Sequence, residues 1–123
     1  MKNILRAILS CAISFLATNA FAGEGAIGPV YLQSVNAIQA NIRGHQAGNL
    51  EIQIAGGFTV PPGVACDPNY ITTLRSVDAD KRMFGLLSLA LATQKPVSLY
   101  ITDNPAVTAY GGRCSLIWVA VER

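Results

Sequence analysis

The chain has little surplus charge and a single histidine, and each scarcity excludes a class of function. Two of its nine basic residues, Lys2 and Arg6, lie within the first 22 residues, which leaves seven Lys and Arg against seven Asp and Glu. A chain without a basic stripe is a poor candidate for nucleic-acid binding. His45, the single histidine, and the two cysteines Cys66 and Cys114 do not match the ligand spacing of zinc sites, so we expect no metal site. We also expect no cofactor.

Enzyme signatures are also missing from the sequence. It contains no Gly-x-Ser-x-Gly nucleophile elbow and no glycine pattern that cradles phosphate. His45 could act as a base, but it follows Gly44 in an expected turn with no nucleophile indicated nearby, which favours an exposed turn residue. Asp78 and Asp80 could form a carboxylate pair for glycoside chemistry, but their position before a helix favours capping. We therefore expect a protein that is not an enzyme.

The most apolar part of the sequence is its beginning. A positive start is followed by an apolar stretch over residues 7–16, and Ala20 and Ala22 place small residues at the positions that signal peptidase recognises. This pattern predicts a secretory signal peptide, residues 1–22, followed by one domain, residues 23–123. No later apolar run approaches the roughly 20 residues of a membrane helix, so we expect a soluble protein in the periplasm or outside the cell.

Export changes the interpretation of the cysteines. Removal of the signal peptide would take Cys11 away and leave Cys66 and Cys114 as a pair. In a small domain exported to an oxidising compartment, this pair favours a disulfide over two free buried thiols.

Alternating or β-branched stretches predict five strands, at residues 26–43, 50–54, 69–75, 97–102 and 114–121. In the first and longest of them the parity of the apolar positions changes, which indicates a bulge or bend near Gln33 and Ser34. The last strand is apolar on both faces, so we expect it to be covered from both sides.

One helix is expected over residues 81–93, between the third and fourth strands. Asp78 or Ser76 is expected to cap its start, Asp80 to lie in its first turn, and Pro96 to prevent its continuation. Its apolar arc covers more than half of the helical circumference, which is wider than one packing surface needs. Two interpretations stay open: the helix is deeply buried under loops, or it packs both on its own sheet and on a neighbouring subunit.

The order of these elements indicates a fold class. Three strands, a helix and two strands is the order of the OB-fold, a five-stranded Greek-key barrel. We therefore expect a mainly β, OB-fold-like barrel with its helix between strands three and four. An open α+β sheet with the helix on one face is the alternative.

Four segments of the chain carry a resemblance to a known family. They are Ala65-Cys66 before the third strand, the helical segment 80–93, the strand 95–100 and the late segment 112–118. On these segments the region from Cys66 to Glu122 resembles small exported bacterial OB-fold proteins related to the binding subunits of pertussis-like and subtilase-type toxins.

The resemblance has implications for function. Binding subunits of these toxins form a ring of five and bind sialylated or other glycans on host cells. The resemblance therefore implies a cell-surface glycan as ligand, a homo-oligomer that would be a pentamer, and an enzymatic toxin subunit as partner. No sugar-binding motif of the family is recognisable between Gly23 and Cys66, so no contact residue is carried over. The other hypothesis is a periplasmic structural or protein-interaction module without a carbohydrate ligand.

Aromatic side chains are the groups that a glycan site would use to stack on sugar faces. Tyr110 is the first candidate for ligand binding because it lies in a glycine-rich loop. Trp118 is the second candidate, although core or subunit packing is the stronger interpretation for a residue of the last strand. Tyr31 and Tyr70 are expected to be half-buried strand residues.

Overall fold

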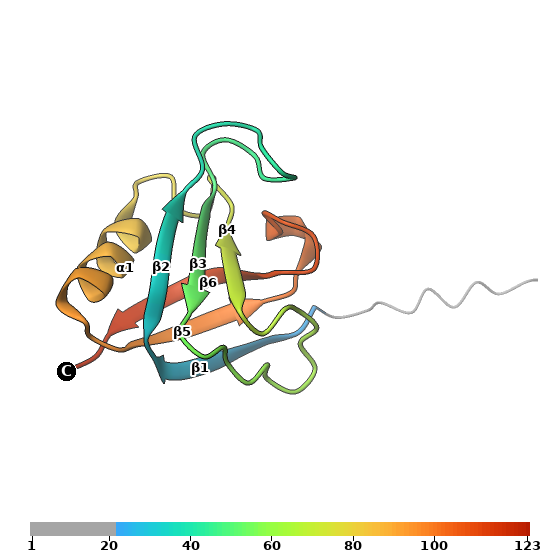
Figure 1. The fold of residues 1–123 in the computed structure, drawn as a ribbon. Helices are drawn as coiled ribbons and strands as arrows, with labels where there is room; N and C mark the ends of the chain where they lie inside the picture. The colour runs from blue at the N-terminus through green and yellow to red at the C-terminus, as the bar shows by residue number, and fades with distance from the viewer. Residues whose placement is uncertain (1–21) are drawn as a thin grey trace, which may run out of the picture.

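The computed structural model describes residues 22–123, which form one six-stranded mixed β-sheet and one α-helix (Figure 1). In chain order the elements are β1 (Glu24–Val30), β2 (Leu32–Ala37), β3 (Leu50–Ile54), β4 (Tyr70–Thr73), α1 (Arg82–Thr93), β5 (Val97–Thr102), a short 3-10 helix (Pro105–Val107) and β6 (Cys114–Val121). The predicted signal peptide, apart from Ala22, lies outside the described residues. No helix within residues 22–123 has the length and apolar character that a membrane crossing requires.

The sheet has the strand order β1-β5-β6-β4-β3-β2, and the β4–β6 pair is its parallel pair. Its two edge strands, β1 and β2, follow each other in the chain and are separated only by Tyr31. In Figure 1, β2, β3 and β4 run across β5 and β6, and β1 lies below them at the other edge, so the sheet folds over onto itself around the apolar core.

The predicted mainly β class with one helix is confirmed, but the number of strands differs. The expected first strand, residues 26–43, is divided at Tyr31 and ends at Ala37, which gives six strands in place of five. By its hydrogen bonds the sheet is open, and no closed barrel is detected. The helix lies between β4 and β5.

The change of parity in the first strand corresponds to a bulge. Leu32 pairs with Ile54 and Ser34 pairs with Gln53, so Gln33 is an extra residue without a partner on β3. This confirms the bulge predicted near Gln33 and Ser34. The extra residue returns the apolar positions to the inner face of the sheet, because it shifts the alternation by one residue.

A second bulge leaves the outer face of β6 uncovered by the rest of the described chain, although the sequence predicted cover on both faces. Tyr100 pairs with Trp118 and Ile101 pairs with Leu116, so Ile117 is the extra residue. The side chains of Ile117 and Trp118 are 37% and 51% exposed on the outer face.

The helix is not deeply buried under loops, which excludes the first of its two interpretations. Leu87 and Ala90 face the core and are buried, and α1 packs against β2 and β6. Leu86 and Leu89, in contrast, are 41% and 54% exposed. Together with Ile117 and Trp118 they leave an uncovered apolar face over α1 and β6.

Asp78 caps the helix, as predicted, although it lies several residues before it. Its two carboxylate oxygens accept the backbone N–H groups of Met83 and Phe84 at 2.9 and 3.0 Å. Asp80 does not lie in the first turn, because α1 begins at Arg82, with which Asp80 forms an exposed ion pair.

We expect Asp78→Ala to lower the free energy of unfolding by about 1 to 2 kcal/mol, because two N–H groups of the first turn lose their acceptor. Asp78 is buried, so water replaces the carboxylate poorly. Urea denaturation measures the change, and Asp80→Ala, which removes an exposed charge, is the control and should stay within about 0.5 kcal/mol of the unmodified protein. Equal effects of the two variants would contradict the capping role.

Candidate functional site

Five side chains that are distant in the sequence meet on the outer side of β3 and β4. Glu51 belongs to β3 and Tyr70 to β4, while His45 comes from the loop after β2. Tyr110 and Arg113 come from the loop that precedes β6. We call these residues the Arg113 cluster.

Arg113 lies at the centre of the cluster. Its guanidinium carbon is 4.4 Å from the ring centre of Tyr70 and 4.3 Å from that of Tyr110, so the cation lies between two aromatic faces. One guanidinium nitrogen donates to the carboxylate of Glu51. The Arg113 and Glu51 side chains are only 19% and 11% exposed, so most of this ion pair is removed from water.

His45 joins the same carboxylate and is not the exposed turn residue that we predicted. Its Nε2 atom is 3.4 Å from Oε2 of Glu51, and its ring centre is 4.4 Å from that of Tyr110. The reason lies in the turn itself, whose central residues are Arg43 and Gly44, both at positive φ as in a type I′ hairpin. The Ile42–His45 bridge closes this turn and directs the chain back toward the sheet.

Burial of His45 and the positive charge of Arg113 lower the pKa of the imidazole below its usual value of 6.5. His45 is therefore neutral at pH 7, and the folded state binds fewer protons than the unfolded state in the acidic range. The stability that depends on neutral His45 is present above pH 6.5 and is lost as the pH falls through the lowered pKa.

We expect the urea midpoint of the protein to fall between pH 7 and pH 5, and to fall less in His45→Gln. Glutamine keeps a polar side chain but cannot bind the proton. An identical decrease in both proteins would show that the loss comes from other groups.

Two polar groups of this face, one in the cluster and one next to it, form no side-chain hydrogen bond within residues 22–123. Gln53 and Tyr70 face each other across β3 and β4. Neither the Gln53 amide nor the Tyr70 hydroxyl hydrogen-bonds to another residue of the described chain, although the Tyr110 hydroxyl donates to the carbonyl of Arg43 at 3.4 Å. These two groups are therefore available to a ligand that touches this face.

The arrangement offers several kinds of group that a ligand could contact. It offers aromatic rings, a planar cation, an imidazole and the free amide and hydroxyl of Gln53 and Tyr70. Within residues 22–123, no group of three or more His, Cys, Asp or Glu side chains could hold a metal ion. His45 contacts a carboxylate and an aromatic ring.

The predicted ligand-binding residues are separated in the structure. Tyr110 belongs to the Arg113 cluster, where its ring packs against Arg113 and His45. Trp118 lies on the outer side of β6, in a hollow that it shares with Leu86 and other residues around the start of α1. Tyr70 is half-buried, as predicted, whereas Tyr31 is 55% exposed between the two edge strands.

Sequence reasoning did not identify Glu51 and Arg113 as site residues, although each is a charged residue next to a structurally important position. Glu51 occupies an outward position of a strictly alternating strand, where a solvated carboxylate is the usual expectation. Arg113 directly precedes Cys114. What the sequence does not contain is the pairing, because 62 residues separate the two side chains.

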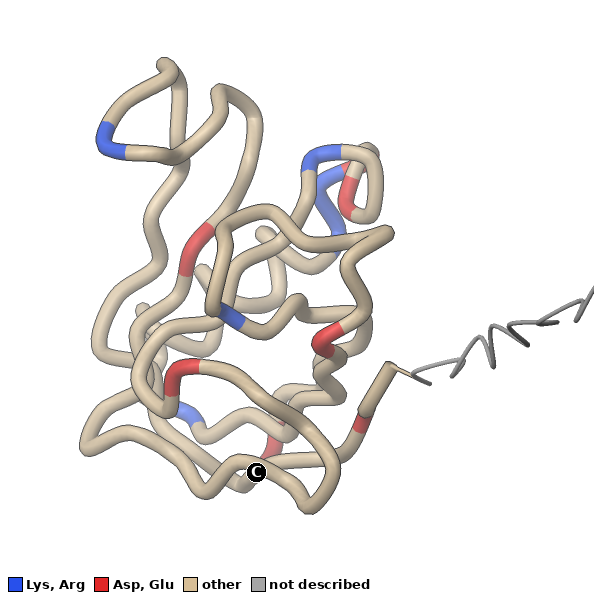
Figure 2. The backbone as a smooth tube through the Cα atoms, turned by 90° about the vertical axis from the view of Figure 1, so that its right-hand side faces the viewer, with Lys and Arg blue, Asp and Glu red and all other residues tan. Residues whose placement is uncertain are grey.

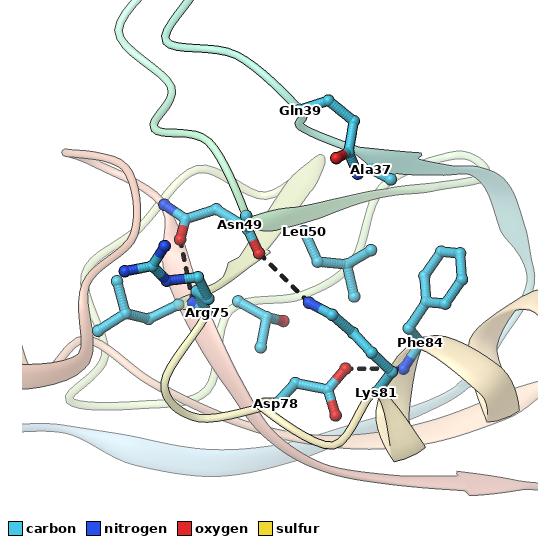
Figure 3. Close-up of a pocket in the computed structure, with 11 residues that line it drawn as sticks. Ala37, Gln39, Asn49, Leu50, Arg75, Asp78, Lys81 and Phe84 are labelled. Atoms are coloured by element: carbon cyan, nitrogen blue, oxygen red, sulfur yellow. Dashed lines mark hydrogen bonds between the residues drawn. The ribbon is translucent and has the colours of Figure 1, made fainter.

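A separate pocket of about 190 Å³ lies between the base of the β2–β3 hairpin, the end of β4 and the start of α1 (Figure 3). Leu50 and Phe84 contribute apolar surface to it, and Lys81 extends across it toward the hairpin. Asn49 accepts the backbone N–H of Arg75 at 3.0 Å and so fixes one wall.

Comparison with known proteins gives no match to a protein-family model, a curated protein or a solved structure. Along the backbone the basic and acidic positions are interspersed (Figure 2). The chemistry of the Arg113 cluster and of the pocket is therefore the basis for a functional assignment.

Proposed function

We propose that this chain is an exported, non-enzymatic binding protein that recognises a cell-surface glycan, similar to a toxin binding subunit. The observation that carries the proposal is the Arg113 cluster, which holds two tyrosine rings beside free hydrogen-bonding groups on one face of the sheet. The disulfide between Cys66 and Cys114 is consistent with an oxidising, extracytoplasmic location.

The strand order supports an OB-fold-like barrel. If β1 and β2 are counted as one strand that bends at Tyr31, the order of the sheet becomes that of a five-stranded OB-fold, with α1 between the third and fourth strands. OB-folds bind oligosaccharides on their second and third strands and on two flanking loops. In this chain those elements are β3, β4 and the loops that carry His45 and Tyr110, which is where the Arg113 cluster lies.

The chemistry of this face suits a sugar. Sugars present hydroxyl groups that need paired donors and acceptors, together with apolar C–H faces that lie against aromatic rings. Gln53 supplies both a donor and an acceptor, and the Tyr70 hydroxyl supplies another. The ion pair of Glu51 and Arg113 keeps the Tyr70 and Tyr110 rings in place, which lowers the entropy cost of binding.

A glycan array with the purified oxidised protein tests the proposal. We expect Tyr70→Phe and Gln53→Ala to weaken binding about tenfold each, because each removes hydrogen bonds to the sugar while Tyr70→Phe leaves the ring beside Arg113. Tyr110→Ala should abolish binding. Tyr31→Phe is the matched control, since it removes a tyrosine hydroxyl outside the cluster. A folded protein that binds no glycan on the array would overturn the proposal.

The uncovered apolar face supports a second candidate function, a protein-interaction module. Leu86, Leu89, Ile117 and Trp118 expose apolar surface on one side of the molecule, as interaction surfaces do. A second copy of the chain is the proposed occupant, because the resemblance implies a homo-oligomer, a pentamer in the toxin relatives. An enzymatic toxin subunit would be the further partner of such a ring.

Sedimentation equilibrium, combined with the glycan array, distinguishes the two candidates. A ring that loses its assembly in Trp118→Gln and binds glycans would support the first candidate together with this interface. A ring that is silent on the array would favour the interaction module, and a monomer that is silent on the array would exclude the toxin-like hypothesis.

A further inference from the structure

We infer that the pocket between the β2–β3 hairpin and α1 is a binding site for a small organic monoanion, a carboxylate attached to a short apolar group (Figure 3). The inference does not depend on the glycan proposal. The Arg113 cluster and the pocket have no residue in common.

The size and the apolar lining define the uncharged part of the ligand. The pocket has a volume of about 190 Å³. A cavity of roughly 150 Å³ lined by Leu, Ile and Phe accommodates benzene, so this pocket has room for about eight non-hydrogen atoms. Ala37, Leu50, Leu74 and Phe84 supply the apolar surface against which a ring or a short alkyl chain would lie.

The charge of the pocket defines the other part of the ligand. The Lys81 ammonium has three donors, and its hydrogen bond to the carbonyl of Gly48 is long, at 3.5 Å. None of the ion pairs formed within residues 22–123 includes Lys81. Asp78 is the acid of the pocket, but both of its oxygens accept N–H groups of the first helical turn. A bound carboxylate would give Lys81 the ion pair that it does not form within residues 22–123.

The backbone at Lys81 shows that the helix itself does not require this side chain. Lys81 has φ 61 in the left-handed region, which glycine or asparagine adopts more readily than lysine. Its side chain makes no cap hydrogen bond to the helix. A residue whose conformation is unfavourable and whose side chain does not cap the helix is consistent with a role for the ammonium in the pocket.

Two further polar side chains border the same space. The stem of Arg75 packs on Gly48 so closely that a Cβ atom there would lie 2.4 Å from its Cδ, which keeps this second cation at the wall of the pocket. Gln39 lies on the opposite, hairpin side with Ala37 (Figure 3). Arg75 and the Gln39 amide would complement a carboxylate that Lys81 holds.

The test uses benzoate as the probe and benzamide as its neutral counterpart, titrated into the 15N-labelled oxidised protein. We expect benzoate to shift the amide signals of Leu50, Lys81 and Phe84, and to bind at least about tenfold more tightly than benzamide, because charge-assisted hydrogen bonds are the stronger ones. Lys81→Met should reduce the affinity for benzoate about tenfold while leaving that for benzamide unchanged. Lys95→Met removes a lysine that does not line this pocket and is the matched control.

A second variant at the same position distinguishes a loss of binding from a loss of folding. Lys81→Gly relieves the left-handed backbone, so it should be at least as stable as the unmodified protein in urea and yet bind benzoate as weakly as Lys81→Met. The inference is overturned if benzamide binds as well as benzoate, if Lys81→Met and Lys95→Met behave alike, or if benzoate shifts no signal of the pocket. Tyr110→Ala should keep the benzoate affinity, so that failure of the glycan proposal and failure of this one are distinguishable.

Discussion

Replacing Cys66 and Cys114 together with alanine is expected to lower the free energy of unfolding by about 4 kcal/mol. The bridge joins residues 48 positions apart. In the chain-entropy estimate, a loop of this length in the unfolded chain accounts for about 4 kcal/mol. Proteins of this size are commonly stable by only about 5 to 15 kcal/mol, so the loss is a large fraction of the total.

The position of the bridge gives a further reason for a large effect. β4 and β6 form the parallel pair of the sheet, and their register contains only Ile71–Cys114 and Thr72–Ser115. Cys114 is fully buried at this short pairing. The disulfide also links the long loop before β4 to this point of β6. Its loss should therefore weaken the β4–β6 pairing in the folded state, in addition to removing the constraint on the unfolded chain.

Urea denaturation with and without dithiothreitol tests this prediction. Reductant should destabilise the unmodified protein by about the same amount as the double alanine substitution. It should have no effect on the double variant, which therefore serves as the control for unspecific effects of the reagent. A double variant within about 1 kcal/mol of the oxidised protein would show that the short β4–β6 pairing holds without the bridge.

Apolar periodicity located most of the framework because it reports burial on one face of an element. The bounds of β3, β5 and β6 agree with the residues predicted from alternation, and the helix begins one residue later than expected. Even the bulge at Gln33 left a trace in the sequence, as a change in the parity of apolar positions. These features depend on residues that are neighbours in the sequence, so the local pattern of apolar residues is enough to predict them.

The second bulge left no such trace. All residues around Ile117 are apolar, so shifting the alternation by one residue changes which side chains are exposed without changing the pattern. For this reason the sequence did not show that Ile117 and Trp118 both lie uncovered on the outer face of the single chain. The uncovered apolar face of α1 and β6 is visible only when the register with β5 is known.

The Arg113 cluster escaped prediction because its contacts are long-range. His45 was interpreted from its neighbour Gly44 as an exposed turn residue, whereas the type I′ turn and Glu51 give it a half-buried position. Two features favour glycine at position 44: its positive φ, and the Tyr110 ring, to which a Cβ atom would come as close as 3.2 Å. Only the second feature involves a distant part of the chain.

Arg113→Met is expected to lower the free energy of unfolding by about 3 kcal/mol, because it leaves the mostly buried Glu51 carboxylate without its cation. It also removes the cation between the Tyr70 and Tyr110 rings. The double variant Glu51→Leu/Arg113→Met should be more stable than the sum of the single effects predicts, with a coupling energy of about 2 kcal/mol. Urea denaturation of the four proteins measures this cycle, and additive effects would show that the two charges do not interact.

The same substitution should weaken the pH dependence of stability. In the unmodified protein, burial of His45 and the positive charge of Arg113 lower the pKa of the imidazole, so stability falls as the pH falls below 6.5. In Arg113→Met, burial still lowers this pKa but the positive neighbour is gone, so the pKa of His45 should lie closer to its usual value. The urea midpoint of Arg113→Met should therefore fall less between pH 7 and pH 5 than that of the unmodified protein. An equal fall in both proteins would show that Arg113 does not act on the pKa of His45.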